Sequence, residues 1–370
     1  DLSDTFLEHF TDIEDFRLQN HNFRRKLSDI FIIAVLATIC GADGWTEVED
    51  FGESKQDWFA SFLELPNGIP SHDTFCRVFR LLNPVHFEDC FLRWIESIQD
   101  KTKGEIIAID GKTLRRSYNT GKGKPAVHMV SAWANTNGLV LGQVKTEEKS
   151  NEITAIPELL SKLSLAGCIV TIDAMGCQKA IATQIHNQEA DYVLALKGNQ
   201  GLLHDDIKTY LDHAISHKKP LDYHEEVDAG HGRIETRRCW VTEDIAWLAP
   251  KAVWTGLRSI CALECERIVG EKISCERRYF ISSLEADATI LANAVRAHWS
   301  IENNLHWVLD VVFKEDYCRA REAYAAQNMA VLRHIALNLL KQENSRKRSI
   351  KNKRLKAGWD ETFLLSVLGF

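Results

Sequence analysis

The sequence lacks the features that mark membrane-spanning, secreted and zinc-binding chains. Its longest largely apolar run, Ile30–Cys40, holds 11 residues, which is too short to cross a bilayer. The first residues are acidic and mixed, unlike the cationic and apolar start of a signal peptide. The ten cysteines are scattered and never form a Cys-x-x-Cys pair, so they indicate small buried residues. We therefore predict a reduced, cytoplasmic protein without a membrane partner.

An excess of positive charge is missing as well. The chain has 45 Lys and Arg against 52 Asp and Glu, and its net charge of −7 excludes binding to nucleic acid through overall charge. Any DNA contact must use local patches. One such patch near the C-terminus predicts either a solvated tail or a DNA contact, and it contains one acid, Glu343, among the cations Lys341, Arg346, Lys347, Arg348, Lys351, Lys353, Arg354 and Lys356.

Residues 1–100 have the pattern of short helices joined by tight turns. Ser28 and Asp29 are candidate caps of a helix that reaches Cys40 and stops at Gly41. Ser71 is a candidate cap of a second helix, whose apolar residues fall on one face. This all-helical domain suits a helix-turn-helix contact with DNA ends, and it suits a plain helical bundle equally well.

The pattern changes to strands at Glu105. A short buried strand ends on Asp110, a hairpin and a helix follow, and strands at 168–172 and 192–196 end on Asp173 and Lys197. This order is that of an α/β, ribonuclease-H-like fold with a mixed five-stranded sheet, interrupted by strands that predict a β insertion. The expected divisions are 1–100 for the helical domain, 101–198 and 286–340 for the catalytic domain, 199–285 for the insertion and 341–370 for a basic C-terminal tail.

The stretch from Arg296 to Asp316 predicts a helix with two distinct stripes. One stripe is apolar and runs from Ala294 to Val312, as in a helix docked on a core. The neighbouring stripe carries Glu302, His306 and Asp310 at a spacing of four residues. A rim helix with solvated charges would give the same pattern.

Asp110 and Asp173 directly follow buried strands. At the carboxyl ends of adjacent strands, both side chains would point into one crevice, where open sheets bind ligands. Two close carboxylates repel unless a cation intervenes, and Mg²⁺ or Mn²⁺ prefer such oxygen ligands. A third carboxylate, Glu302, would complete a two-metal site that acts on a phosphodiester. Taken singly, each aspartate could equally be a turn or cap residue.

Several short motifs occur together and in order along nearly the whole chain. They are GIPSHDTFCRVF from Gly68, AIDGKTLRRS from Ala108, KSNEITAIPELL from Lys149, TIDAMGCQK from Thr171, ALKGNQG from Ala195, HGRIETR from His231 and HWSIENNLHWVLDVVFKED from His298. In these motifs the sequence resembles the insertion-sequence DDE transposases, a family that includes the H-repeat-associated proteins.

The resemblance implies metal-dependent hydrolysis of DNA at an element's ends and transfer of the freed 3′ hydroxyl into target DNA. It implies Asp110, Asp173 and Glu302 as the catalytic and metal-binding triad, with two Mg²⁺ or Mn²⁺ ions. The partners would be double-stranded DNA, with terminal inverted repeats and a target, bound by a homodimer or higher oligomer on the nucleoid. Asp310 remains a rival third ligand, as do Glu315 and Asp316. Related transposases often carry Tyr, Arg and Lys where this sequence has Val295, His298 and Leu309.

DNA contacts are expected from side chains near the strand ends and on the final helix. Arg233 and Arg237 share one face of a strand, where they could meet DNA phosphates or form a cross-strand ladder of ion pairs. A regulator derived from a transposase and a metal-dependent nuclease without strand transfer remain alternative functions. The expected DNA-binding residues are Lys112, Arg115, Arg116, Lys197, Asn199, His231, Arg233, Arg237, His298, Trp299 and His306.

Overall fold

The computed structural model describes most of the chain. The described residues are 4–11, 13, 15–17, 25–99, 103–118, 120–123, 125–146, 152–230, 232–345 and 347–369. His231 and Arg346, for which DNA contacts were considered above, lie outside them, as do residues 149–151 of one quoted motif.

The N-terminal part is helical, as predicted. Gly41 ends α2 in the left-handed conformation, with φ of 117°, and its N–H reaches back to the last turn. The helix starts at Leu27, before Ser28 and Asp29, so the predicted caps are wrong. In the described part of the chain, no single helix is long and apolar enough to cross a membrane; α2 and α3 meet that test only as a pair bent by 97°. The helices are α1 (Asp4–Thr11), α2 (Leu27–Cys40), α3 (Trp45–Ser54), α4 (Gln56–Ala60), α5 (His72–Leu81) and α6 (Pro84–Ile98).

The described strands form one mixed sheet in the order β3-β2-β1-β4-β5-β9-β8-β7-β6. The pairs β1–β4 and β4–β5 are parallel, and all other neighbours are antiparallel. The strands are β1 (Ile106–Thr113), β2 (His128–Ala134), β3 (Leu139–Thr146), β4 (Ile169–Ile172), β5 (Asp191–Leu196), β6 (Asp222–Gly230), β7 (Arg233–Thr242), β8 (Ser259–Val269) and β9 (Lys272–Ser282).

The predicted five-stranded sheet is not confirmed, because the described strands form one sheet of nine. The insertion does not form a separate layer. Its last strand, β9, pairs with β5 from Val193↔Ser282 to Leu196↔Tyr279 and so continues the sheet. Without this pairing, β5 would leave a row of backbone groups unpaired at the edge of the sheet.

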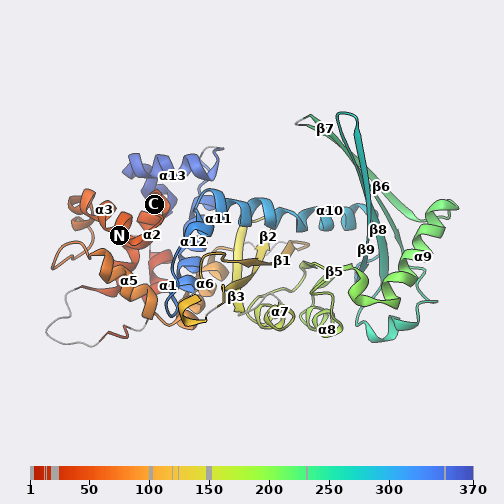
Figure 1. Ribbon diagram of the computed structural model, residues 1–370, viewed down its shortest axis with the longest axis horizontal. Helices are drawn as coiled ribbons and strands as arrows, with labels where there is room; N and C mark the ends of the chain where they lie inside the picture. The colour runs from red at the N-terminus through yellow and green to blue at the C-terminus, as the bar shows by residue number, and fades with distance from the viewer. Residues whose placement is uncertain are drawn as a thin grey trace.

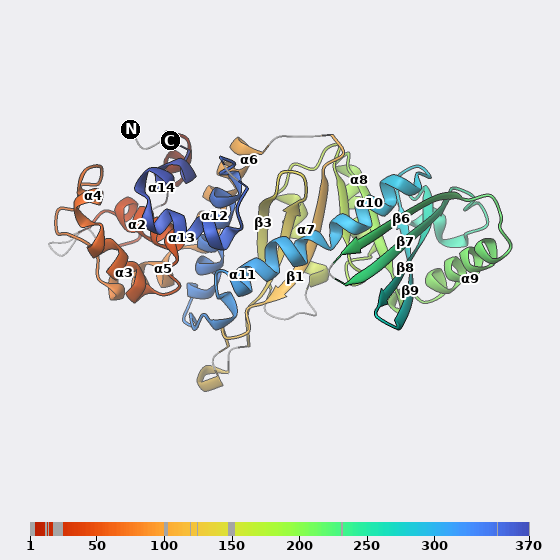
Figure 2. The same ribbon diagram turned by 90° about the horizontal axis from the view of Figure 1, so that it is seen from above.

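Helices cover both faces of the sheet, as Figures 1 and 2 show. The helices α7 (Glu152–Ser161) and α8 (Lys179–Asn187) lie on one face, and α10 (Ala288–His298) and α11 (Trp307–Val311) run along the other. On the insertion, α9 (Leu202–Ser216) packs against β8 and β9. Strands β6–β9 extend beyond α10 as a protruding arm.

The last helices join the sheet to the N-terminal helices. Asn338 of α12 (Ala325–Gln342) hydrogen-bonds both the N–H and the C=O of Val140, at 2.9 Å each, and so covers the free edge of β3. The region predicted as a basic tail contains α13 (Ile350–Trp359) and α14 (Glu361–Val367). Helix α13 packs against α2 and α12.

The apolar stripe predicted for the final helices is confirmed. Ala294, Ile301, Leu305 and Val308 are all buried. The apolar side of α10 packs over a cluster contributed by β4, β5 and the insertion strands. This packing fixes the rotation of the helix, and the rotation decides where its polar stripe points.

Candidate active site

Asp110 and Asp173 lie opposite each other at the end of a parallel strand pair. The register of β1 and β4 pairs Ile109 with Ile172, and an aspartate follows each of these residues. Beyond this point β1 continues to Thr113 as a partner of β2 alone. The two carboxylates therefore meet at the carboxyl end of β4, as the sequence predicted.

The turn after Asp173 holds its carboxylate in place. Its Oδ1 accepts hydrogen bonds from the N–H of Met175 at 3.0 Å and of Gly176 at 3.4 Å. A Cβ on Gly176 would lie 2.3 Å from Ile172 Cγ2, so only glycine allows the chain to turn this closely. The turn thus uses one carboxylate oxygen.

Glu302 comes from a π-helical turn, Glu302–His306, between α10 and α11. His306 Nδ1 is 3.0 Å from Glu302 Oε2 and 3.6 Å from Asp110 Oδ2. Ligand atoms of Asp110, Glu302 and His306 lie within 4.8 Å of one another. His306 Nε2 is buried and has no hydrogen-bond partner among the described residues. Single π turns of this kind often occur at functional sites.

Asp173 lies on the same cavity although it is not a member of this tight group. The cavity has a volume of about 200 Å³, and Asp110, Asp173 and Glu302 all line it. The structure therefore gathers the three predicted carboxylates around one space. Its other polar or aromatic lining includes Lys197, Arg278, His298 and Trp299.

The charges around Asp110 are not balanced. Burial raises the pKa of Asp110 to about 6; His306 opposes this rise, whereas the charges of Asp173 and Glu152 add to it. The hydrogen bond with His306 lowers the pKa of Glu302. Clustered carboxylate oxygens beside an imidazole nitrogen are a suitable donor set for a divalent cation such as Mn²⁺ or Mg²⁺. Such a cation would relieve the repulsion that opposes ionisation of Asp110.

Comparisons with known proteins show the family of the chain. A family model described as "Transposase DDE domain" matches residues 101–339, and one described as "DDE_Tnp_1-associated" matches residues 7–95. The chain belongs to the DDE transposase family. It is therefore a DNA transposase of the insertion-sequence type, as the sequence motifs predicted.

Two relatives with transposase in their names align along nearly the whole chain. YncI of Escherichia coli O157:H7 is 44% identical over 98% of this chain and 94% of its own length. The H repeat-associated YhhI of Escherichia coli K12 is 41% identical over 98% of this chain and 97% of its own. A cryo-EM structure of a piggyBac transposase synaptic complex with hairpin DNA aligns with a TM-score of 0.47 and 13% identity, covering 99% of this chain and 77% of that one.

A buried pair behind Asp110 was not predicted from the sequence. His128 Nε2 is 2.5 Å from Glu152 Oε1, and His128 Nδ1 is 2.9 Å from Thr113 Oγ1. A Cβ on Gly111 would lie 2.4 Å from both His128 and Glu152, so the pair fits only beneath a glycine. Glu152 lies within one of the transposase-like motifs, and its place in that motif could have indicated from the sequence that it belongs near the site.

Lys112 turns away from the cavity of the transposase into an acidic cluster. Its Nζ is 2.6 Å from Glu315, 2.7 Å from Asp310 and 3.8 Å from Asp316. Burial lowers the pKa of Lys112, but Glu315 and Asp310 outweigh this effect and the net shift is upward. The three acids that rivalled Glu302 as third ligand are thus ion-paired with this lysine.

Arg115 and Arg116 lie beside the same acidic segment. Arg115 Nε is 3.3 Å from Asp316 Oδ2, and its side chain is 78% exposed. The Arg116 guanidinium lies 5.2 Å from the centre of the Tyr317 ring. The guanidinium groups of both arginines lie near the surface, beyond the end of β1.

The loop after β5 supports the cavity from another side. Lys197 is exposed and lines the cavity, whereas Asn199 donates a hydrogen bond of 2.6 Å to the C=O of Ala174, next to Asp173. His298 Nδ1 is 3.1 Å from Thr171 Oγ1. Burial lowers the pKa of His298, which favours its neutral form.

The arginines of β7 pair with an acid of their own strand, and the cross-strand ion pair of that acid is with Arg267 of β8, at 3.5 Å. Arg233 Nε is 3.1 Å from Glu235, and Arg237 pairs with the same carboxylate from the other side. Trp299 is 49% exposed, and the guanidinium of Arg278 lies 4.8 Å from its ring centre. The wall between the cavity and the insertion therefore combines ion-paired arginines with an exposed aromatic ring.

Proposed function

We propose that this transposase hydrolyses phosphodiester bonds at the ends of its element and joins the freed 3′ hydroxyl to target DNA. The observation that carries the proposal is the convergence of Asp110, Asp173 and Glu302 on one cavity at the carboxyl end of β4. We assign these three carboxylates as ligands of two Mg²⁺ or Mn²⁺ ions. When bound, such ions lower the pKa of water or of a 3′ hydroxyl and stabilise the leaving oxygen.

The other residues of the site orient these groups. His306 holds the Glu302 carboxylate toward Asp110 through its hydrogen bond of 3.0 Å. Lys197 and Arg278 line the cavity, where a phosphate oxygen could accept their hydrogen bonds. His298, whose pKa is lowered by burial, lines the same cavity, where it can donate a hydrogen bond to DNA.

The arrangement of strands supports a ribonuclease-H-like core. Strands β3-β2-β1-β4-β5 follow one another in the sheet, with β2 antiparallel and β4 and β5 parallel to β1. The insertion then separates β5 from α10, the helix that leads into Glu302. We infer that the protein acts on double-stranded DNA of the nucleoid, in the cytoplasm, as a dimer or higher oligomer.

The test is nicking of duplex DNA that carries the element's terminal repeats, in Mg²⁺ or Mn²⁺. Asp110→Asn, Asp173→Asn and Glu302→Gln should each slow nicking by at least about a hundredfold, since each removes a metal-binding carboxylate. Asp110→Asn should not lower the melting temperature. The substitution removes a carboxylate whose ionised form is disfavoured in the folded protein. Asp205→Asn, on the exposed start of α9, is the matched control and should nick at the parental rate.

The products separate the remaining alternatives. Joined strand-transfer products support a transposase, whereas cleavage without joining would support a nuclease. DNA binding with no metal-dependent cleavage would support a regulator. Parental nicking rates in Asp173→Asn would overturn the assigned chemistry.

A further inference from the structure

The basic C-terminal segment divides into two sets of cations. Members of the first set are used inside the protein. Lys353 Nζ donates a hydrogen bond of 2.8 Å to the C=O of Leu340, and Arg354 Nη2 donates one of 2.9 Å to the C=O of Thr38. Both side chains are buried. These two cations attach α13 to α12 and α2 and are not available to a ligand.

The second set, Lys347, Arg348 and Lys351, is exposed. Within the described part of the chain, none of these three side chains forms an ion pair. They lie just before and in the first turn of α13. Three adjacent cations without acidic partners repel one another, so their surroundings are suited to an anion.

These cations line one side of a cleft between α11 and α13, which we call the α11–α13 cleft. It has a volume of about 640 Å³, and the opposite side is formed by Asn303, Asn304, Trp307 and Val311. Trp307 and Val311 are each 55% exposed. Among the described residues that line the cleft, none is acidic. Figures 1 and 2 both show α13 beside α11.

The α11–α13 cleft is lined by the residues that directly follow Glu302 in the chain. Asn303 and Asn304 follow Glu302 directly within the π-helical turn, and both line the cleft. In this turn Glu302 lines the active-site cavity, whereas the next two residues line the cleft. A polymer that passes the carboxylates can therefore continue along α11 toward the free cations.

We propose that the α11–α13 cleft binds the backbone of the DNA next to the bond being cut. Lys347, Arg348 and Lys351 neutralise its phosphates, and Trp307 packs against its sugars. The proposal rests on the proposed function, because it takes DNA as the substrate of the adjoining carboxylates. DNA fits better than an acidic peptide, since its phosphates are regularly spaced anions that match a row of cations.

The test measures binding of a fluorescein-labelled 40-base-pair duplex to the full chain by anisotropy, in EDTA and in an Asp173→Asn background. The DNA is not cleaved under these conditions, so the assay measures binding alone and a loss of catalysis cannot be mistaken for a loss of binding. The variant Lys347→Ala/Arg348→Ala/Lys351→Ala should bind about ten- to a hundredfold more weakly at 0.1 M salt. The slope of log K against log salt should become shallower by about 2.7, or 0.9 for each of three phosphates.

The matched control removes three exposed lysines elsewhere: Lys179→Ala/Lys218→Ala/Lys251→Ala. It changes net charge by the same amount and should bind within about twofold of the parent. Equal losses in the two variants, or no loss in the first, would overturn the proposal. Melting temperatures of both variants show whether α13 is still folded. Lys347→Arg/Lys351→Arg should retain binding, because the charges are kept.

A second pair of variants tests the aromatic side of the cleft. Trp307→Ala should weaken duplex binding about fivefold or more, whereas Trp359→Ala, at the exposed end of α13, should have no effect. If the triple cleft variant loses binding to a polyglutamate peptide but retains binding to DNA, the occupant is an acidic protein and the proposal fails. If the parent chain binds no duplex at all, the proposed function fails too.

Discussion

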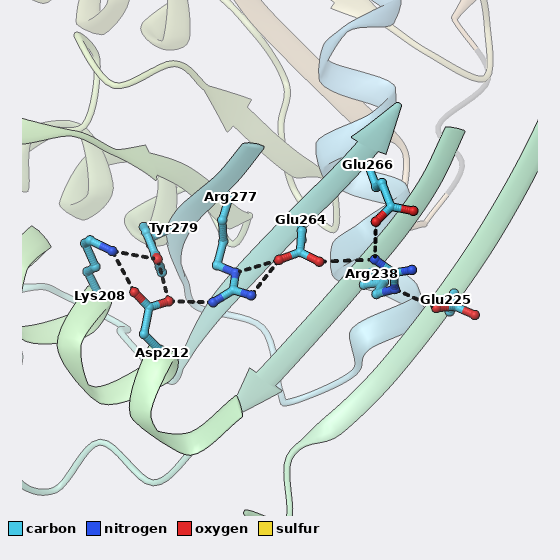
Figure 3. Close-up of polar contacts among 8 residues, drawn as sticks. All are labelled: Lys208, Asp212, Glu225, Arg238, Glu264, Glu266, Arg277 and Tyr279. Carbon is cyan, nitrogen blue, oxygen red and sulfur yellow. Dashed lines mark hydrogen bonds and ion pairs between the residues drawn. The ribbon is translucent and has the colours of Figure 1, made fainter. Parts of the chain in front are cut away.

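Two clusters of charged side chains in this transposase have opposite arrangements. On the outer face of the insertion, acids and arginines alternate across four strands and α9 (Figure 3). Arg238 lies between Glu225 at 2.8 Å and Glu264 at 3.2 Å, and Arg277 lies between Glu264 and Asp212, which is 2.7 Å away. The register that pairs Glu225, Arg238, Glu264 and Arg277 in one row explains this alternation.

In the active site, acids instead face other acids. Asp110 has Asp173 and Glu152 near it, and their charges add to the rise of its pKa. Burial supplies the largest part of that rise, and His306 and the backbone N–H of Gly111 oppose it. A cluster whose charges are already balanced stabilises the fold, whereas one with unbalanced carboxylates requires a cation from outside. The balance of charge within a cluster, rather than its number of charged residues, therefore distinguishes a cluster that stabilises the fold from one that can bind a cation.

The largest effect is expected where a cation is buried among acids. Lys112→Met should lower the free energy of unfolding by about 3 kcal/mol, because it leaves Glu315 buried without its closest cation. Lys197→Met, which removes an exposed lysine on the active-site cavity, should change stability by less than about 0.5 kcal/mol. Urea denaturation of both variants measures this contrast. A stable Lys112→Met variant that bound DNA weakly would mean that Lys112 contacts DNA.

A smaller effect is expected at an isolated buried acid that belongs to neither cluster. Burial raises the pKa of Glu88 from 4.5 to about 7, against the opposing effects of Gln327 and Lys162. The folded state therefore binds more protons than the unfolded state between these values, and stability falls as pH rises through this window. Glu88→Gln should remove this fall and stabilise the protein at pH 8 by on the order of 2 kcal/mol. Urea denaturation at pH 5 and pH 8 measures it; an unchanged pH dependence would contradict the assignment.

The smallest effect is expected in the ladder of the insertion. Glu264→Gln should lower the free energy of unfolding by about 1 kcal/mol, since both arginines keep another acidic partner and the ladder is partly exposed. Nicking by this variant should match the parent. A thermal melt and a nicking assay of the same sample check both statements. A loss of nicking at full stability would show that this face takes part in the reaction.

Sequence reasoning located two of the three carboxylates from local pattern alone. A short buried strand followed by an aspartate occurs twice, and parallel neighbours bring both ends to one edge. Glu302 was a candidate from its helical stripe, but preferring it over Asp310, Glu315 and Asp316 needed the resemblance to transposases, because an exposed acid on a helix is common. The π turn that carries it leaves no mark in composition, since it changes only which carbonyl each N–H reaches.

Local sequence pattern could not predict which strands pair with each other or which charged side chains form ion pairs. Alternating residues in 224–282 predicted strands, but alternation does not specify which strand lies beside which, and pairing of β9 with β5 was missed. Lys112 follows Asp110 and looked like a phosphate ligand. Its true partner, Glu315, is 203 residues away in the sequence. Only the folded chain brings such groups together.

The pairing of β5 with β9 also has a mechanical consequence. Inter-strand hydrogen bonds continue without a break from β3 to β6, so the protruding arm is not hinged to the catalytic core. Swinging the arm would require the bonds from Val193 to Leu196 to break together. Strand β4, which ends at Asp173, is one strand away from this seam. A force on the arm is thus transmitted through continuous backbone hydrogen bonding to the strand that ends at Asp173.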